Sequence, residues 1–501
     1  MIGRKSFLVF STLILTFTLQ LVGMLLLTQL FPPDVYGSIT FALSFVATFD
    51  CLANLGFNSA HIKRISEGRD IADCVSTFTT VKLGLTFSMA VIVLVSMLIW
   101  TELLGHYLSP VSRALIEVFL VYQVMYDIVS IAILTFNART EMSKAYLVNL
   151  LDPLARIPII AILAWAGGDI YQVSLAYVVG SSLVLLVGLR LLARERIPWK
   201  RPTLFRSYLA FALPMAPIAV LETLSNNIDK LLIGAIGDTT GVAYYAAAKY
   251  LLCGLGAVGL ALSLNAFPAF SSACHRGNLR EVKRMAREAE RLISILITPL
   301  VIVLVLFPTE VCIFVFGPKF SSSGEPLRYL SVATLLVVLN QVYLSQILGM
   351  NRPRISARIT FLDFIVFLGL MLYLIPPHLF GIPTADMSFS GAALAAAITS
   401  LITTFVTRFV VWRLIDTRPN PRMLLHAAAA IFTSVSLAIF STFIQVHEIY
   451  DVVLYGILAY SIFELILLIT RELSRKDVWY ILSILNLAEM WKYVRRELRG
   501  K

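Results

Sequence analysis

The sequence contains little charge and few of the side chains that most enzymes and metal sites use. Only 14% of its 501 residues are charged, whereas soluble domains carry about 25%. Six histidines stand apart, and five cysteines, at positions 51, 74, 253, 274 and 312, follow neither a zinc spacing nor a paired disulfide framework. We therefore expect packing roles for the cysteines, no metal site and no cofactor.

Enzyme signatures are also missing from the sequence. It has no glycine-rich phosphate loop, no His-Glu-x-x-His, no nucleophile elbow and no Cys-x-x-Cys. The longest external loops that we predict, 313–325 and 376–390, contain no carboxylate pair or histidine cluster. We therefore expect no catalytic residues, and a membrane enzyme acting on sugar lipids is the less favoured alternative.

Apolar residues dominate instead, at 58% of the chain with a mean hydropathy of +0.83. The charges are bunched, and the apolar runs between them are about 20 residues long, enough for a helix to cross a bilayer. The sequence predicts an all-α polytopic membrane protein with about 14 transmembrane helices. The predicted spans are 7–30, 35–56, 83–101, 114–136, 146–167, 172–190, 207–236, 241–267, 292–312, 326–349, 359–375, 391–412, 423–445 and 450–470.

The basic residues predict the orientation of these spans. Of 41 lysines and arginines, 35 fall on the segments that share a side with the N-terminus, and three fall opposite: Arg113, Lys319 and Arg328. The positive-inside rule therefore predicts a cell (plasma) membrane protein with both termini in the cytoplasm. The net charge of +11 then reflects topology and anionic membrane lipid, and we expect no nucleic-acid partner.

Two pairs of short segments suggest an internal repeat. Phe31-Pro-Pro-Asp corresponds to Gly237-Asp-Thr-Thr, and Phe136-Asn-Ala-Arg corresponds to Met350-Asn-Arg-Pro. The alternative is that membrane sequences resemble one another by composition. The repeat predicts an N-lobe of spans 1–6 at 1–200, a C-lobe of spans 7–12 at 207–415, spans 13–14 at 416–471, and a cytoplasmic amphipathic tail at 472–501.

Ionisable residues inside the predicted spans are the functional candidates, because each is costly in the membrane. A substrate diphosphate would suit three cations: Arg156, Lys230 and Lys249. A coupling ion or a cavity lining would suit four carboxylates: Asp50, Asp127, Glu222 and Asp229. Two structural alternatives remain open. Asp152 and Arg156, four residues apart, can neutralise each other, and Asp229 can pair with Lys249.

Pro214 and Pro217 interrupt the hydrogen bonding of the predicted span 207–236. Proline breaks in transporter helices often mark positions that bend during alternating access, so both residues are hinge candidates. An ordinary tolerated kink is the alternative.

Several motifs resemble a known family. Leu213-Pro-Met-Ala-Pro, Asn227-Ile-Asp-Lys-Leu-Leu, Tyr244-Tyr-Ala-Ala-Ala and Asn54-Leu-Gly-Phe-Asn-Ser-Ala look like the polysaccharide export proteins. These are the O-antigen and teichoic-acid repeat-unit flippases of the multidrug/oligosaccharidyl-lipid/polysaccharide exporter superfamily. The resemblance implies a V-shaped bundle, like that of the multidrug exporters called MATE. It implies alternating access that moves a polyprenyl-diphosphate-linked glycan from the inner to the outer leaflet for surface polysaccharide assembly.

The resemblance also implies partners, namely the polymerase or glycosyltransferases of the same pathway. Lipid II flippases keep an Arg-Asp pair on their first span, whereas 7–30 has no charge here, which argues against lipid II as substrate. A cation-coupled, MATE-like exporter of amphiphilic small molecules is the alternative within transport. Such exporters usually have twelve spans, so the two additional spans favour the lipid-linked branch.

Overall fold

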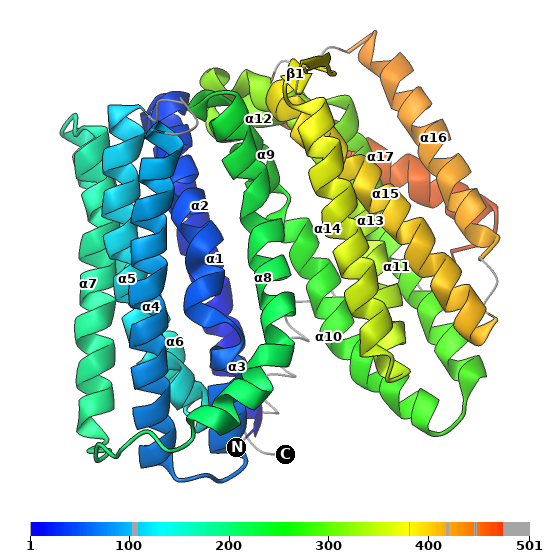
Figure 1. Ribbon diagram of the computed structural model, residues 1–501. Helices are drawn as coiled ribbons and strands as arrows, with labels where there is room; N and C mark the ends of the chain where they lie inside the picture. Colours follow the sequence, from blue (N-terminus) through cyan, green and yellow to red (C-terminus); the bar gives the residue numbers. More distant parts are fainter. Residues whose placement is uncertain are drawn as a thin grey trace. The chain divides into compact units, whose positions relative to one another are not determined.

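The computed structural model describes residues 2–102, 109–379, 381–416, 420–444, 446 and 448–473 (Figure 1). The chain divides into two compact units within helix α8 (Phe205–Ile236), with unit 1 ending at Leu231 and unit 2 beginning at Leu232. The predicted lobe boundaries remain predictions, and most of the predicted tail, 474–501, lies outside the described residues.

Unit 1 is built from α-helices throughout its described residues. Helix α5 is central and packs against α2, α3, α4, α6 and α7, while α1 packs against α6. Its core includes Val129 and Phe136 of α5, Val148 of α6 and Val184 of α7. The helices before α8 are α1 (Ile2–Leu30), α2 (Pro33–Asn54), α3 (Phe57–Ser66), α4 (Ile71–Glu102), α5 (Pro110–Ala138), α6 (Met142–Trp165) and α7 (Ile170–Arg194).

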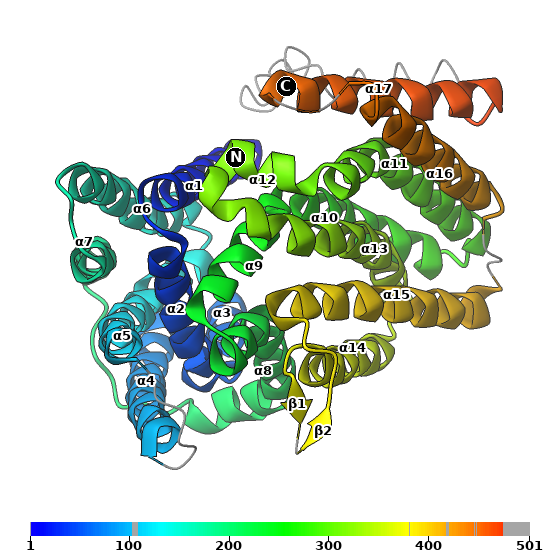
Figure 2. The ribbon, with the colours of Figure 1, turned by 90° about the horizontal axis from the view of Figure 1, so that it is seen from above.

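The described residues of unit 2 are helical apart from one short hairpin, β1 (His378–Leu379) with β2 (Ile382–Pro383), in which Leu379 lies opposite Ile382. Helix α13 packs against α10, α11 and α15, and α16 and α17 lie beside α11 (Figure 2). Its further elements are α9 (Thr239–Leu251), α10 (Cys253–His275), α11 (Leu279–Leu306), α12 (Pro308–Phe316), η1 (Pro318–Ser323), α13 (Gly324–Gly349), α14 (Pro353–Leu374), α15 (Ser388–Ile415), α16 (Arg422–Ser441) and α17 (Ile449–Ile469).

Twelve helices in the described part of the chain are long and apolar enough to cross a membrane, and Leu15–Leu30 forms a shorter apolar helix. Large apolar side chains face outward from these helices, including Phe87 at 72%, Phe405 at 68% and Ile431 at 66% exposure. Soluble monomers rarely show extended apolar surfaces of this kind. The predicted all-α polytopic membrane fold is confirmed, whereas the count of about 14 spans stays a prediction.

Three predicted spans differ from the observed helices. The span 241–267 is interrupted at Leu252, between α9 and α10, and the span 292–312 is interrupted at Phe307, before Pro308 starts α12. Helix α4 begins at Ile71, well before the predicted start of its span at residue 83. Apolar runs locate a buried segment, but they do not show where packing or a proline ends a helix.

The turn from α2 to α3 is fixed by glycine. Leu55 and Gly56 have positive φ values of 39° and 80°. A Cβ atom on Gly56 would lie 2.7 Å from the carbonyl oxygen of Ala212 on α8. Only glycine fits both this left-handed conformation and this close approach. The turn therefore packs α3 directly against the proline-containing part of α8.

Two pairs of helix ends in the two units have the same backbone pattern. The N–H of Arg69 bonds to the carbonyl of Arg64 after α3, and the N–H of Asn278 bonds to that of Ala273 after α10. The turns after α5 and α13 have the same hydrogen bond, from a backbone N–H to the carbonyl five residues earlier. In these turns Thr140 and Asn351 have positive φ values of 60° and 57°. The same bond also follows α6, from Gly168 to Leu163, so it is a common helix ending, and the repeat stays a prediction.

Candidate functional site

A buried ion pair joins α4 to α5 inside unit 1. The Lys82 Nζ lies 2.7 Å from Asp127 Oδ1, and the two side chains are 2% and 5% exposed. The same Nζ donates a hydrogen bond of 3.1 Å to the carbonyl of Ala53, near the end of α2. The ammonium is therefore held by three helices at once.

A second carboxylate belongs to this cluster. Gln123 Nε2 donates a hydrogen bond of 2.9 Å to Asp50 Oδ1, and Gln123 lies one helical turn before Asp127 on α5. Asp127 Oδ2 is buried and accepts no hydrogen bond from the described residues. We call Asp50, Lys82, Gln123 and Asp127 the Lys82 cluster. With two carboxylates and one ammonium, it carries one negative charge when all three groups are ionised, so it is suited to hold a proton or a monovalent cation.

Arg156 lies in a second polar cluster of unit 1, between α5, α6 and α7. Arg156 Nη2 is 2.9 Å from Asp152 Oδ2, and the guanidinium lies 4.2 Å from the centroid of the Tyr177 ring. Tyr122 packs edge-on against Tyr177, and the Tyr126 hydroxyl donates to Asn149 Oδ1 at 3.2 Å. We call Tyr122, Tyr126, Asn149, Asp152, Arg156 and Tyr177 the Arg156 cluster.

Asp152 and Arg156 form an ion pair, as the structural alternative predicted from their spacing of four residues. Asp152 binds both Nε and Nη2 of the guanidinium, at 3.3 and 2.9 Å. An anionic ligand would therefore meet an arginine whose charge is already partly balanced. The surrounding tyrosines provide aromatic faces and hydroxyl groups, which are suited to sugar rings and phosphate oxygens.

The remaining predicted residues of unit 1 lie along α8. Asp229 is fully buried, and its Oδ1 accepts a hydrogen bond from the Lys230 backbone N–H at 2.8 Å. Lys230 Nζ lies 3.4 Å from Asn227 Oδ1, and Glu222 is exposed. Pro214 and Pro217 are exposed and lie inside the continuous helix α8. The structure thus places these residues on another helix than Arg156, with different neighbours, and their hinge and binding roles remain predictions.

Lys249, the third predicted cation, belongs to unit 2. It lies in the last turn of α9, with its Nζ 5.8 Å from the centroid of the Tyr245 ring. Its predicted diphosphate contact is a proposal.

The sequence interpretation missed Lys82 and the aromatic residues around Arg156. Lys82 lies one residue before the predicted span 83–101. In unit 2 it also missed Glu290 on α11, which is 2% exposed and lies 3.9 Å from Arg408 on α15. Lys82 and Arg408 lie near the ends of the predicted spans 83–101 and 391–412, where basic residues are expected at the cytoplasmic border, and no sequence signal identified their acidic partners on other helices.

Two polar groups outside the candidate spans stabilise unit 1. His61 on α3 is fully buried, with ring nitrogens 2.9 Å from the Tyr208 hydroxyl and 3.0 Å from Thr135 Oγ1. Burial lowers the pKa of His61 to about 3, so this ring is neutral. At the end of α7, hydrogen bonds from Lys144 and then Arg139 lower the pKa of Glu195.

The fold and these buried charges define a class: a polytopic α-helical membrane protein with charged groups inside its bundle, as in transporters. The model of a family described as polysaccharide biosynthesis protein matches residues 2–274. The chain belongs to this family.

Solved structures of a flippase and of a multidrug transporter have the same fold. A lipid II flippase, MurJ, in an inward closed conformation aligns with a TM-score of 0.74 at 14% identity, over 93% of this chain and 99% of that chain. An inward-facing multidrug resistance transporter of the MATE family aligns with a TM-score of 0.62 at 16% identity, over 81% and 96%. At these identities the likeness establishes the fold.

Similarity to curated proteins is more limited. The uncharacterized membrane protein MJ1068 of Methanocaldococcus jannaschii is 26% identical over 96 residues, which is 19% of each chain. The matched part therefore spans about a fifth of that relative.

Proposed function

We propose that this protein is a flippase that moves a polyprenyl-diphosphate-linked oligosaccharide repeat unit from the inner to the outer leaflet by alternating access. No covalent bond is made or broken in this process. The observation that carries the proposal is the match to polysaccharide biosynthesis proteins in a chain with an exporter fold. A pathway member built as a transporter would move an intermediate of the pathway. The moved glycan would serve surface polysaccharide assembly, with the pathway's polymerase or glycosyltransferases as partners.

Within this proposal, Arg156, Lys230 and Lys249 bind the diphosphate, because several cations are needed to replace water around such an anion. Asp50, Asp127, Glu222 and Asp229 bind the coupling ion or line the cavity. The Lys82 cluster supports an ion role for Asp50 and Asp127, since it holds two carboxylates against one ammonium. Pro214 and Pro217 allow α8 to bend.

The test is translocation by the full-length protein in proteoliposomes. The substrate is a fluorescent polyprenyl-diphosphate disaccharide, and a membrane-impermeant reductant bleaches only the molecules in the outer leaflet. We expect the protein to move the fluorescent substrate of the inner leaflet to the outer leaflet, so that the reductant bleaches it as well. Translocation no faster than in protein-free vesicles would contradict the proposal.

Arg156 provides the matched variant. Losing a charge-assisted phosphate contact of about 1.5–3 kcal/mol should weaken apparent substrate affinity about 10- to 150-fold in Arg156→Ala, with partial rescue in Arg156→Lys. The control is Arg113→Ala, which removes an exposed ion pair of the same i, i+4 spacing with Glu117. Unchanged translocation in Arg156→Ala would exclude a substrate role for this arginine.

Cation-coupled export of amphiphilic small molecules is the second candidate, and the net negative Lys82 cluster favours it. A proton or sodium gradient should then drive uptake of a lipophilic fluorescent cation into the same proteoliposomes. If this uptake occurs and the sugar lipid does not move, the exporter function is correct and the flippase function is wrong.

A further inference from the structure

Unit 2 contains a strongly basic pocket that the proposed transport path does not use. It has a volume of about 570 Å³ and lies where the first turns of α11, the start of α16 and the segment after α17 meet. Small-ligand pockets have volumes of about 300–1,000 Å³. The pocket is lined by Arg280, Lys283, Arg284, Arg287, Glu288, Arg291, Asn420, Pro421, Arg422 and Glu472.

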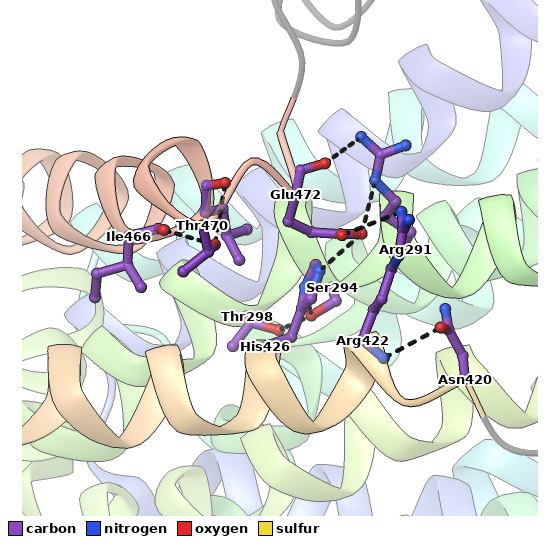
Figure 3. Close-up of polar contacts among 10 residues, drawn as sticks. Arg291, Ser294, Thr298, Asn420, Arg422, His426, Ile466, Thr470 and Glu472 are labelled. Carbon is purple, nitrogen blue, oxygen red and sulfur yellow. Dashed lines mark hydrogen bonds and ion pairs between the residues drawn. The ribbon is translucent and has the colours of Figure 1, made fainter.

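One carboxylate organises the inner wall of the pocket. Glu472 is 5% exposed, and its carboxylate lies 3.3 Å from Arg291 Nε and 3.2 Å from Arg422 Nη1 (Figure 3). Arg291 Nη2 also donates a hydrogen bond of 2.9 Å to the Glu472 backbone carbonyl. These contacts hold α11, α16 and the segment after α17 together, so two of the pocket's arginines are fixed in place.

Buried groups support this wall from behind. His426 on α16 is 2% exposed, with Nε2 3.9 Å from Glu472 Oε1 and Nδ1 2.9 Å from Ser294 Oγ on α11 (Figure 3). Ser294 in turn lies 3.2 Å from Thr298 Oγ1. The base of the pocket is therefore a connected polar network inside unit 2 and not a chance grouping of surface chains.

The outer wall carries an excess of positive charge. Arg280, Arg284 and Arg287 follow one face of α11 at i, i+4 and i+7, where like charges repel one another. Arg284 lies 3.8 Å from Glu288, and Lys283 Nζ donates to the Asp416 carbonyl at 3.0 Å. Among the described residues, Arg280 and Arg287 have no acidic partner within ion-pair distance. Six basic and two acidic side chains line the pocket, so a bound anion would relieve this repulsion.

We propose that this pocket binds an anion with clustered phosphate groups. Arginine forks bind phosphate oxygens in pairs, and several forks in one pocket suit two or more adjacent phosphates. In the predicted topology the pocket faces the cytoplasm, where both anionic lipid headgroups and soluble phosphate compounds occur. The shared chemistry admits either source. The site is independent of the proposed transport function, because its test measures binding and not translocation.

The experiment uses the full-length protein in phospholipid nanodiscs. In phosphatidylcholine discs, inorganic pyrophosphate is titrated at low salt by calorimetry. In discs of mixed phosphatidylcholine and cardiolipin, whose headgroup carries two phosphates, native mass spectrometry counts the anionic lipids that remain bound. The test variant is Arg284→Gln with Arg287→Gln, and the control is Arg352→Gln with Arg354→Gln, which removes the same charge from exposed positions next to the start of α14.

We expect the test variant to lose at least about tenfold in pyrophosphate affinity, or most of its retained cardiolipin, while the control keeps both. Loss of pyrophosphate binding identifies a soluble phosphate ligand, and loss of lipid retention alone identifies a headgroup. Equal binding in wild type and test variant, or equal losses in the control, would overturn the proposal. If the double variant does not fold, Arg287→Gln alone provides the same comparison.

Discussion

Lys82 compensates carboxylate charge in the interior of unit 1, where water is excluded. Its ammonium lies 2.7 Å from Asp127, and both side chains are buried. Removing one partner of a buried pair typically costs about 3–5 kcal/mol, because the other charge is left uncompensated. We expect Lys82→Met to lower the free energy of unfolding by about this amount. Adding Asp127→Asn should recover most of the loss, as measured by thermal unfolding of the detergent-solubilised protein.

An exposed pair provides the control for this change. Arg113 and Glu117 are 3.7 Å apart, at 49% and 54% exposure, and such surface pairs contribute about 0–1 kcal/mol. If Lys82→Met is no more destabilising than Arg113→Met, the buried pair does not stabilise unit 1.

The two ionic clusters differ in how far the sequence could predict them. Asp152 and Arg156 are four residues apart on one helix, so their pairing follows from helical geometry. Lys82 and Asp127 are 45 residues apart, on helices whose contact depends on the packing of the whole unit. A single sequence marks both as charged residues near apolar runs, but it does not contain the distance between them.

At the scale of elements, α3 is held in place by its histidine. His61 stacks on Phe78 of α4, with ring centroids 4.1 Å apart, and hydrogen-bonds to groups on α5 and α8. Its pKa is about 3 in the folded protein and about 6.5 in the unfolded chain. Below pH 6.5 the unfolded chain therefore binds a proton that the folded protein does not, and stability falls as the pH falls towards 3.

This difference predicts a specific pH dependence. Between pH 7.5 and pH 5, His61 should remove about 2 kcal/mol of stability, at about 1.4 kcal/mol per pH unit below 6.5. His61→Gln cannot titrate in this range, so its stability deficit relative to wild type should shrink by about 2 kcal/mol at pH 5. Thermal unfolding of both proteins across this range measures the effect, and parallel pH curves would show that His61 is not the responsible group.

Helices α6 and α7 are in close contact at Gly180. A Cβ atom there would lie 2.5 Å from Asp152 Oδ1 and 3.4 Å from Arg156 Cβ. Gly180→Ala should therefore force the helices apart and disturb the Arg156 cluster. We expect a loss of about 1–3 kcal/mol in thermal unfolding.

Gly84 on α4 is the matched control, because a Cβ atom there meets nothing within 4 Å. Gly84→Ala should stabilise the helix by about 0.5–1 kcal/mol. Similar effects of the two substitutions on stability would mean that the helices can accommodate a methyl group at Gly180.

The elements themselves were largely predictable, because each predicted span coincides with an apolar run that the bilayer requires to be helical. The breaks were less predictable. Gly56 turns the chain because Ala212, which is distant in the sequence, occupies the space that a side chain would need. The helix is also interrupted at Leu252, and leucine is not a residue type that predicts a break.

At the scale of the whole molecule, the transport proposal depends on which side of the membrane each helix end faces. Helix α11 has 28 residues and is roughly 42 Å long at 1.5 Å per residue, so it exceeds a hydrocarbon core of about 30 Å. Its basic start and its apolar end must therefore lie on opposite sides. The positive-inside rule predicts that the start, and with it the proposed phosphate pocket, lies in the cytoplasm.

Single cysteines test this orientation. In a variant without the five native cysteines, Arg276→Cys before α11 should resist a membrane-impermeant maleimide in intact cells and react only after permeabilisation. Ser322→Cys, between α12 and α13, should react from outside. The cysteine-free parent gives the background signal, and labelling of total protein in detergent confirms that both thiols are reactive. External labelling at position 276 with protection at 322 would contradict the predicted topology, and the basic pocket would then lie on the outer face.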